Sequence, residues 1–403
     1  MERIVLLIAV VALLALGTPP ATAPAGGTPD ARPARDAALG SYALALSAVE
    51  HHAMFSARFD RAGLVTQSLQ DWLAARDLYG AYLTPADYAR YRETQRVDYA
   101  GIGLILTREK DGTTRCEPLA DSPAERAGIR RGDQLIAVDG EPVRGRALPA
   151  LAAHAAGEIG TPVTLDLVDA TGVPRRVTPV RAALHDVSVS TSTVNGARIV
   201  RITRFAPDTP NALAFALQQW PAHEPVIVDL RGCGGGDFYA AVDSAMLFLA
   251  VGETIVTVDG RSGSRSYVAT ARRPLPAQPV WLWQDDGTAS AAELFVAALV
   301  EHGRARSVGL STAGKGSRQE ILQLADGAAL LLTTGYLRTP RGQPFEGVGL
   351  APQVPLAAAH AGTDDYLRAS GSVADSSRMR AATRREPSVP PRGRTSKDTR
   401  HER

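Results

Sequence analysis

Two apolar runs are each followed by a turn and then by a helical stretch, in the order of an α/β protein. Residues 226–230 (Val-Ile-Val-Asp-Leu) and 279–283 (Pro-Val-Trp-Leu-Trp) are short and rich in β-branched or aromatic side chains, as buried strands are. The first runs into a glycine-rich turn, and the second leads to residues 291–300, an amphipathic run of good helix formers. This alternation predicts a core with a largely parallel sheet.

The N-terminal region has a different pattern. Residues 1–25 combine a basic Arg3, a short apolar run and Ala23-Pro24-Ala25, which fits a signal-peptidase site. We therefore expect export to a bacterial-type periplasm, with an uncleaved membrane anchor as the alternative, although the apolar run is short for a bilayer span. Residues 26–38 are rich in Ala, Pro and Gly and are expected to be a linker, and residues 39–96 an N-terminal helical domain.

Charge is unevenly distributed along the 403 residues, whose formal net charge is only +2. From Ser376 onward there are nine Lys or Arg against three Asp or Glu, which leaves 35 against 39 before it. A mildly acidic folded part argues against a nucleic-acid groove. Residues 361–403 lack apolar periodicity and are expected to be a disordered basic tail, with contact to anionic lipid as a weaker alternative.

The spacing of the cysteine and histidine residues does not indicate a disulfide or a metal site. The two cysteines, Cys116 and Cys233, fall in different predicted domains, so free thiols are favoured over a disulfide. No clustered His, Cys or acidic spacing indicates a metal, and no cofactor is expected. The glycine turn at 232–236 lacks a P-loop lysine or dinucleotide-binding spacing, so a phosphate site there is disfavoured.

Ser290 stands immediately before the predicted helix 291–300. A helix N-terminus has unpaired backbone N–H groups and a positive dipole end, which favour a developing anion. The N–H of Ala291 is therefore a candidate for one half of an oxyanion hole. For a serine in this place considered alone, a helix N-cap is the better interpretation.

The ordered set of motifs around Ser290 changes that balance. Residues 288–293 read Thr-Ala-Ser-Ala-Ala-Glu, residues 314–316 read Gly-Lys-Gly, and Gln319 follows Lys315 by four positions. With the 25-residue spacing of Lys315 after Ser290, this set resembles the tail-specific, or C-terminal processing, serine peptidase family. The resemblance covers about residues 97–356 and implies that Ser290 is the nucleophile, Lys315 the base and Gln319 its support.

A lysine acts as a base only when it is neutral. Burial lowers a lysine pKa because it disfavours the ammonium form. A neutral Lys315 would take the Ser290 proton and return it to the leaving amine, while Gln319 orients the lysine amine. If Lys315 is exposed, Gln319 is better interpreted as a solvated loop residue.

The glycine turn after residue 230 supplies the other candidate oxyanion donor. Residues 229–236 read Asp-Leu-Arg-Gly-Cys-Gly-Gly-Gly and resemble the family's D-L-R-x-N-x-G-G motif, which maps the donor onto Gly235 or Gly236. Cys233 and Gly234 stand where the family usually has Asn and Pro, a departure expected to loosen the turn. A catalytic role for the Cys233 thiol is a disfavoured alternative.

Residues 97–182 resemble a PDZ domain. Gly101-Ile102-Gly103-Leu104 resembles the carboxylate-binding loop, in which backbone N–H groups converge on a peptide C-terminus beside an open strand edge. The run at 121–140 closely resembles the PDZ core of bacterial proteases. Residues 78–88, with Thr84 and Pro85 at a helix start, resemble the family's segment leading into that domain.

The sequence therefore predicts an α/β multidomain chain: an N-terminal helical segment, a PDZ domain, and a mixed α/β catalytic core over residues 183–360. The function implied is an exported serine endopeptidase that cuts proteins near C-termini captured by the PDZ domain. A catalytically degenerate PDZ-bearing binding protein is the main alternative. A Ser-His-Asp hydrolase using His302 is disfavoured, because twelve helical residues separate it from Ser290. Protein tails are the expected partners; membrane proximity, a homo-oligomer and an adaptor partner stay open.

Overall fold

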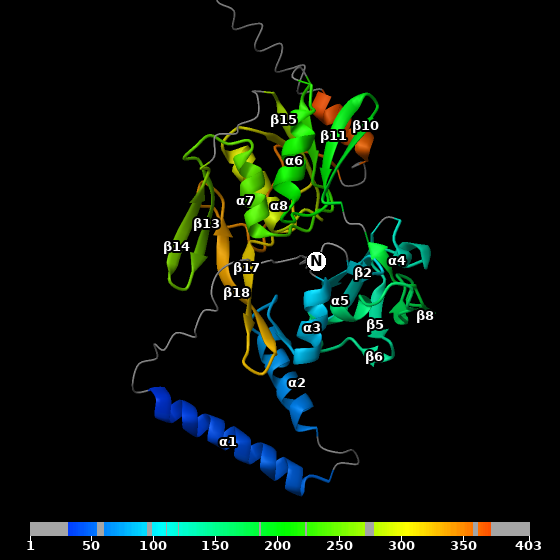
Figure 1. The fold of residues 1–403 in the computed structure, drawn as a ribbon, viewed down its shortest axis with the longest axis vertical. Coiled ribbons are helices and arrows are strands. Elements are labelled where there is room, and N and C mark those ends of the chain that lie inside the picture. The colour runs from blue at the N-terminus through cyan, green and yellow to red at the C-terminus, as the bar shows by residue number, and fades with distance from the viewer. Residues whose placement is uncertain are drawn as a thin grey trace, which may run out of the picture.

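The computed structural model describes residues 31–54, 60–94, 99–109, 111–119, 121–184, 187–221, 224–270, 278–357 and 362–371. The expected signal peptide and most of the expected tail lie outside these residues. Figure 1 shows a parallel-sheet region at the top, the PDZ-like domain at the right, and the helices α1 and α2 below. The β17–β18 hairpin runs between the upper and lower parts.

The upper sheet has six strands in the order β10-β11-β12-β15-β16-β19, parallel from β11 onward. Helices α6, α7 and α8 pack together beside it (Figure 1). Because successive side chains of a strand point to opposite faces, β12 and β15 feed two cores. Val228 and Leu282 join the cluster that contains the helices, and Ile227 and Trp283 join a cluster on the other side. The elements are β10 (Val189–Val194), β11 (Ala197–Ile202), β12 (Val226–Asp229), β15 (Val280–Gln284), β16 (Arg306–Gly309), β19 (Val354–Pro355), α6 (Thr209–Gln218), α7 (Phe238–Met246) and α8 (Ala291–Glu301).

A helix over residues 363–371 contributes to that second cluster. The sequence prediction that disorder begins at residue 361 is wrong for this stretch. The helix is too short to show a clear apolar period, and it is stabilised by tertiary contacts instead. Tyr366 is fully buried, packs on Trp283 with ring centroids 5.3 Å apart, and donates a 2.7 Å hydrogen bond to the carbonyl of Gln284.

A second, antiparallel sheet lies between the parallel sheet and the N-terminal region. Its strand order is β1-β18-β13-β14, and β17 pairs with β18. The first strand comes from the N-terminal region, so residues 81–83 complete a sheet otherwise built from residues beyond 254. The strands are β1 (Ala81–Leu83), β13 (Thr254–Gly260), β14 (Gly263–Val268), β17 (Ser317–Gln323) and β18 (Ala329–Arg338).

The PDZ-like domain is a separate β structure with its own buried cluster. Its main sheet runs β3-β4-β5-β7-β8 with β6 on β5, and β2 pairs with β9. One face of α5 joins this cluster through Leu151, while Ala150 packs with Leu83 and Ala329 of the second sheet. The elements are β2 (Tyr99–Gly101), β3 (Leu104–Arg108), β4 (Thr114–Pro118), α4 (Pro123–Arg126), β5 (Gln134–Val138), β6 (Glu141–Pro142), α5 (Leu148–Ala155), β7 (Leu165–Val168), β8 (Pro174–Val177) and β9 (Ala182–Leu184).

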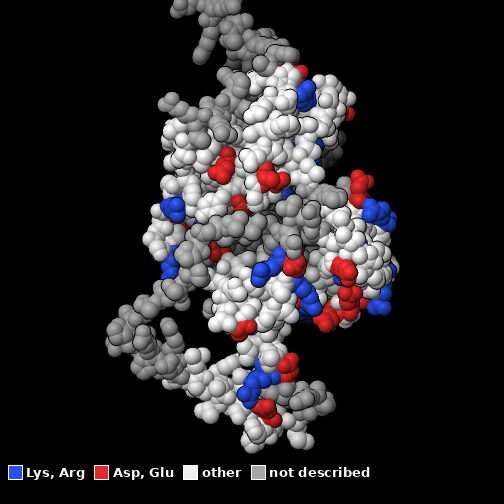
Figure 2. Space-filling view, viewed as in Figure 1, with Lys and Arg blue, Asp and Glu red and all other residues white. Residues whose placement is uncertain are grey.

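The N-terminal helices are α1 (Ala31–His52), α2 (Arg61–Ala74) and α3 (Pro85–Thr94). The helix α1 begins at Ala31, inside the expected linker of residues 26–38, and an alanine-rich sequence with a proline near its start favours such a helix. No helix within the described ranges is long and apolar enough to cross a membrane. On the face in Figure 2, acidic and basic side chains are interspersed, in keeping with the small net charge.

Candidate active site

Three loops meet at one edge of the parallel sheet. The glycine turn follows β12, the Ser290 loop follows β15, and the Lys315 loop follows β16, and these strands are direct neighbours. The carboxyl ends of parallel strands lie at the same edge, where open α/β sheets form their binding crevices. The sheet order therefore brings together the motifs that the sequence separates.

Ser290 occupies the position before α8 with an unusual backbone, φ 56° and ψ −118°. An ordinary N-cap residue has an extended conformation, so the N-cap interpretation alone does not explain this geometry. A non-glycine residue with positive φ is strained and needs support from its surroundings. Ala289 and Ala291, on either side, are buried and small.

The support comes from Glu293, a fully buried carboxylate in the first turn of α8. One of its oxygens, Oε2, accepts 2.8 Å hydrogen bonds from the backbone N–H groups of both Ser290 and Lys315. The other, Oε1, accepts from Gly314 N at 2.8 Å and from the Thr312 hydroxyl. Burial raises the pKa of Glu293, and these four donors act in the opposite direction. Glu293 is absent from the site residues predicted from the sequence, although a carboxylate three residues after a serine is a capping-box signal.

The two candidate oxyanion glycines occupy different surroundings. Gly235 has φ +101°, and a Cβ built on it would lie 2.7 Å from the Ala289 carbonyl oxygen and 2.8 Å from Ser290 Cβ. The same Cβ would lie 2.9 Å from Ala291 N, the first N–H of α8, which has no intrahelical acceptor. Gly236, with φ +142°, instead packs on the backbone of Phe205. Gly235 is thus the glycine that touches the nucleophile turn.

Hydrogen bonds fix the glycine turn where its sequence departs from the family pattern. Cys233 N donates to Leu230 O at 3.0 Å, and Cys233 O accepts from Ala289 N at 2.9 Å. The side chain of Cys233 is fully buried in the cluster of the helices, whereas Cys116 belongs to the PDZ-like cluster. Cysteine and glycine here are therefore compatible with a turn that is directly bonded to the Ser290 loop.

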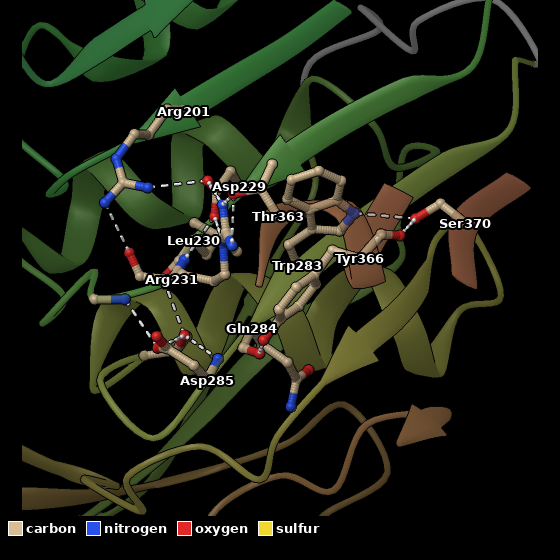
Figure 3. A network of polar contacts seen from close by, with 12 residues as sticks. Arg201, Asp229, Leu230, Arg231, Trp283, Gln284, Asp285, Thr363, Tyr366 and Ser370 are labelled. Carbon is tan, nitrogen blue, oxygen red and sulfur yellow. Dashed lines mark hydrogen bonds and ion pairs between the residues drawn. The ribbon is translucent and has the colours of Figure 1, made fainter. Parts of the chain in front are cut away.

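Charged side chains from the turn itself and from its neighbours form a network of polar contacts around it (Figure 3). Arg231 donates to the buried Asp229 at 2.7 and 2.8 Å, and its guanidinium lies 4.9 Å from the Trp283 ring centroid and 4.7 Å from that of Tyr366. Asp285 accepts from Gly232 N at 2.8 Å, which joins the turn to the Ser290 loop. These contacts hold the β12 and β15 loops in a fixed relation.

Lys315 lies in the loop that joins β16 to β17. Its Nζ is 4.8 Å from the ring centroid of Tyr79, a buried residue before β1. Burial lowers the pKa of Lys315 to about 8, against the opposing influence of the Glu346 and Glu293 carboxylates. A substantial fraction of this lysine is thus neutral near pH 8, as a general base requires.

Gln319 is on β17, opposite Thr333 of β18. Its Nε2 donates to the Ser317 hydroxyl at 3.0 Å and the Thr333 hydroxyl at 3.3 Å. Thr333 is bonded in turn, through N and Oγ1, to Asp77 at 2.7 and 2.8 Å. Contact of Gln319 with the lysine amine stays a prediction. Asp77 and Tyr79 also lie in this part of the site, and no motif in their own segment of the sequence indicated this.

The remaining candidates lie elsewhere. His302 ends α8 at the far end from Ser290, and its Nε2 is 2.6 Å from Thr254 O. Across the described residues, no group of three or more His, Cys, Asp or Glu side chains is arranged for a metal. In the predicted carboxylate-binding loop, Gly103 has φ +68° and lies so close to Ser122 that a Cβ would come within 2.4 Å. The following strand, β3, is an edge strand of its sheet and pairs with β4 on one side.

Comparison with known proteins matches this architecture. Peptidase family S41 matches residues 197–356, and a PDZ domain matches residues 115–169. The chain is 31% identical over 301 residues to a carboxyl-terminal-processing protease of Synechocystis sp. (strain ATCC 27184 / PCC 6803 / Kazusa), covering 71% of this chain and 69% of that protein. It is also 31% identical over 287 residues to the carboxy-terminal processing protease CtpA of Bacillus subtilis (strain 168), covering 69% of this chain and 60% of that protein.

Among solved structures, a photosystem II D1 C-terminal processing protease superposes with a TM-score of 0.62 at 26% identity, covering 78% of this chain and 86% of that one. The predicted fold class, a PDZ domain ahead of a mixed α/β core, is confirmed. The chain belongs to peptidase family S41, the family of the carboxyl-terminal-processing serine proteases.

Proposed function

We propose that this protein is a serine endopeptidase that cleaves proteins near their C-termini by a Ser290–Lys315 dyad assisted by Gln319. The observation that carries the proposal is the shared carboxylate oxygen, Glu293 Oε2, which lies 2.8 Å from the backbone nitrogens of both dyad residues. A serine on a strained turn and a lysine of lowered pKa, joined through this carboxylate, are the types of group that nucleophilic catalysis requires.

The chemistry follows from these groups. Ser290 Oγ attacks the scissile carbonyl carbon while its proton passes to Lys315 Nζ, and the carbonyl π electrons move to the oxygen. The N–H groups of Gly235 and Ala291, with Gly236 as the alternative glycine, stabilise that oxyanion. Collapse breaks the C–N bond, and the lysine ammonium gives its proton to the leaving amine. Water then attacks the acyl-enzyme carbonyl and loses a proton to Lys315. Collapse of this second intermediate breaks the ester C–O bond, Lys315 returns the proton to Ser290 Oγ, and the new C-terminal acid is released.

In this proposal the PDZ domain binds the C-terminal peptide of the substrate. The loop from Gly101 to Leu104, with Ile102 and Gly103, precedes the end strand β3, so a C-terminal peptide is expected to add to that strand. Residues 1–25 support export to the periplasm, with membrane anchoring as a further outcome. Peptide and protein tails are the proposed partners.

The test is cleavage of fluorescein-labelled β-casein, a disordered protein, by wild type and Ser290→Ala. Ser290→Ala should abolish cleavage and melt within about 2 °C of wild type, because it removes the nucleophile and at most one cap interaction. Ser192→Ala, on the exposed strand β10, is the matched control and should retain full activity. Equal cleavage by wild type and Ser290→Ala would refute the proposal and favour a non-catalytic binding protein.

A further inference from the structure

Two residues far from the dyad in sequence lie around the amine of Lys315. Tyr79 comes from the segment between α2 and β1, and Glu346 from the loop after β18. The Lys315 Nζ lies over the Tyr79 ring, 4.8 Å from its centroid, which is within the range of a cation–π interaction. Burial lowers the pKa of Lys315, and the Glu346 carboxylate, followed by Glu293, acts in the opposite direction by favouring the ammonium form.

Tyr79 and Glu346 are also bound to each other. The Tyr79 hydroxyl donates to Glu346 Oε1 at 3.4 Å. The second oxygen, Glu346 Oε2, is buried and has no hydrogen-bond partner among the described residues. A buried carboxylate oxygen without a donor is costly unless a nearby cation compensates it. The Gly316 N–H, the Ser317 hydroxyl and the Tyr79 hydroxyl favour the ionised form of Glu346, and the positive charge of Lys315 acts in the same direction.

The Tyr79 ring is fixed from two sides. It belongs to the buried cluster of the PDZ domain, together with Ile102 and Leu106. Two residues earlier, Asp77 accepts both hydrogen bonds from Thr333 of β18. The ring therefore has little freedom to move away from the lysine.

We propose that Tyr79 and Glu346 are positioning residues that stabilise the ammonium form of Lys315 when it takes the Ser290 proton. The proposal rests on the Ser290–Lys315 mechanism and assigns that mechanism a counter-charge. Lys315 begins each half-reaction neutral and is a cation while the tetrahedral intermediate exists, a charge that is costly in a buried place without a nearby negative group. The groups that face it are Tyr79, Glu346 and, from α8, Glu293, whose oxygens are already occupied by four donors.

The effect of the Glu346 charge on the pKa of Lys315 can be measured without an activity assay. The chain has three lysines, Lys110, Lys315 and Lys397, so competitive acetylation by acetic anhydride, followed by mass spectrometry, reads each amine separately. Only a neutral amine reacts, so the pH dependence of labelling gives the pKa of Lys315. Since a nearby carboxylate favours the ammonium form, Glu346→Gln should lower that pKa by about one unit.

Glu320→Gln is the matched control, because it removes the same charge from a partly exposed position on β17, where Glu320 pairs with Arg318. It should leave the Lys315 labelling curve unchanged. A Glu346→Gln curve that coincides with wild type would overturn the proposal. This result is independent of the Ser290→Ala cleavage assay, which tests the proposed function.

Activity measurements distinguish the contribution of the Tyr79 ring from that of its hydroxyl. On β-casein at pH 9, Tyr79→Phe keeps the aromatic face and should retain most of kcat, whereas Tyr79→Leu should lose about tenfold in kcat with little change in KM. Glu346→Gln should shift the rising limb of the pH–rate profile to lower pH while lowering its plateau. Equal losses for Phe and Leu, or a loss confined to KM, would contradict a role for the ring at the lysine.

Discussion

The two halves of the dyad are held in different ways. Ser290 is held within the parallel sheet, by the glycine turn at 230–236 and by Glu293 of its own helix. Lys315 lies in the loop that leads from that sheet to β17 of the antiparallel sheet, with Tyr79 over its amine and Glu346 favouring its ammonium form. The nucleophile thus depends on loops of the parallel sheet and its own helix, whereas the base depends on segments outside that sheet, including Tyr79, which packs in the PDZ cluster.

Substitutions around Ser290 and around Lys315 are therefore expected to have different effects on the pH–rate profile. Changes around Ser290 should lower the rate at every pH, because they displace the nucleophile or the oxyanion donors. Changes around Lys315 should alter the pH dependence, because they change the free energy of its ammonium form. Glu293 is the exception, since it holds both halves.

The largest effect is expected for Glu293→Ala. It leaves the backbone N–H groups of Ser290, Gly314 and Lys315 without a buried acceptor, so we expect a loss of about 4 kcal/mol in the free energy of unfolding and no measurable cleavage. Denaturant melts and β-casein cleavage measure both. Glu293→Gln, which keeps the shape and one acceptor oxygen, should fold and lose about 100-fold in kcat.

Glu301→Ala, at the other end of α8, is the control for this variant. Its carboxylate accepts from Arg341 N near the surface, so the change should cost about 1 kcal/mol and leave kcat unchanged. Similar losses of activity for Glu293→Gln and Glu301→Ala would contradict the role given to Glu293.

Next in size is Gly235→Ala. Its Cβ would meet the Ala289 carbonyl oxygen at 2.7 Å, so the turn must shift and the oxyanion donor with it; we expect a fall of about 100-fold in kcat. Gly252→Ala has a similar φ of +90° and open space around it, so it shares the backbone strain without the displacement. Steady-state kinetics of the two variants should show a fall in kcat for Gly235→Ala and none for Gly252→Ala.

A smaller effect is expected for Cys233→Ala. The turn acts through its backbone, and the buried thiol fills space in the helix cluster. We expect a loss of about 1 kcal/mol in stability and at least half of wild-type activity. Complete loss of cleavage with a normal melting curve would restore the alternative that the thiol is catalytic.

The smallest effect is expected for Tyr366→Phe. This change removes one hydrogen bond to the Gln284 carbonyl but keeps the ring against Arg231. A melt should show a loss of about 1 kcal/mol, with kcat unchanged. A large fall in kcat would mean that the helix at 363–371 controls the glycine turn more directly than its contacts indicate.

The same contrast explains what the sequence revealed. The strands before the two loops were visible as apolar runs, because both faces of β12 and β15 are buried. The motifs around Ser290 and Lys315 were close enough to their strands to be placed by sheet topology. Tyr79, Asp77 and Glu346 were missed, because each acts through a contact between segments more than 200 residues apart or across separate loops. The helix at 363–371 was missed because tertiary burial of Tyr366 stabilises it.

The most direct measurement is the pH dependence of β-casein cleavage by wild type and Lys315→Arg, with melting curves for both. Lys315 must be neutral to act, and its pKa is lowered to about 8, so wild-type activity should rise with pH through that value. Arginine keeps the positive charge but cannot accept the Ser290 proton, so Lys315→Arg should fold and be inactive at every pH tested. A folded Lys315→Arg enzyme with near-wild-type turnover would contradict the serine–lysine mechanism.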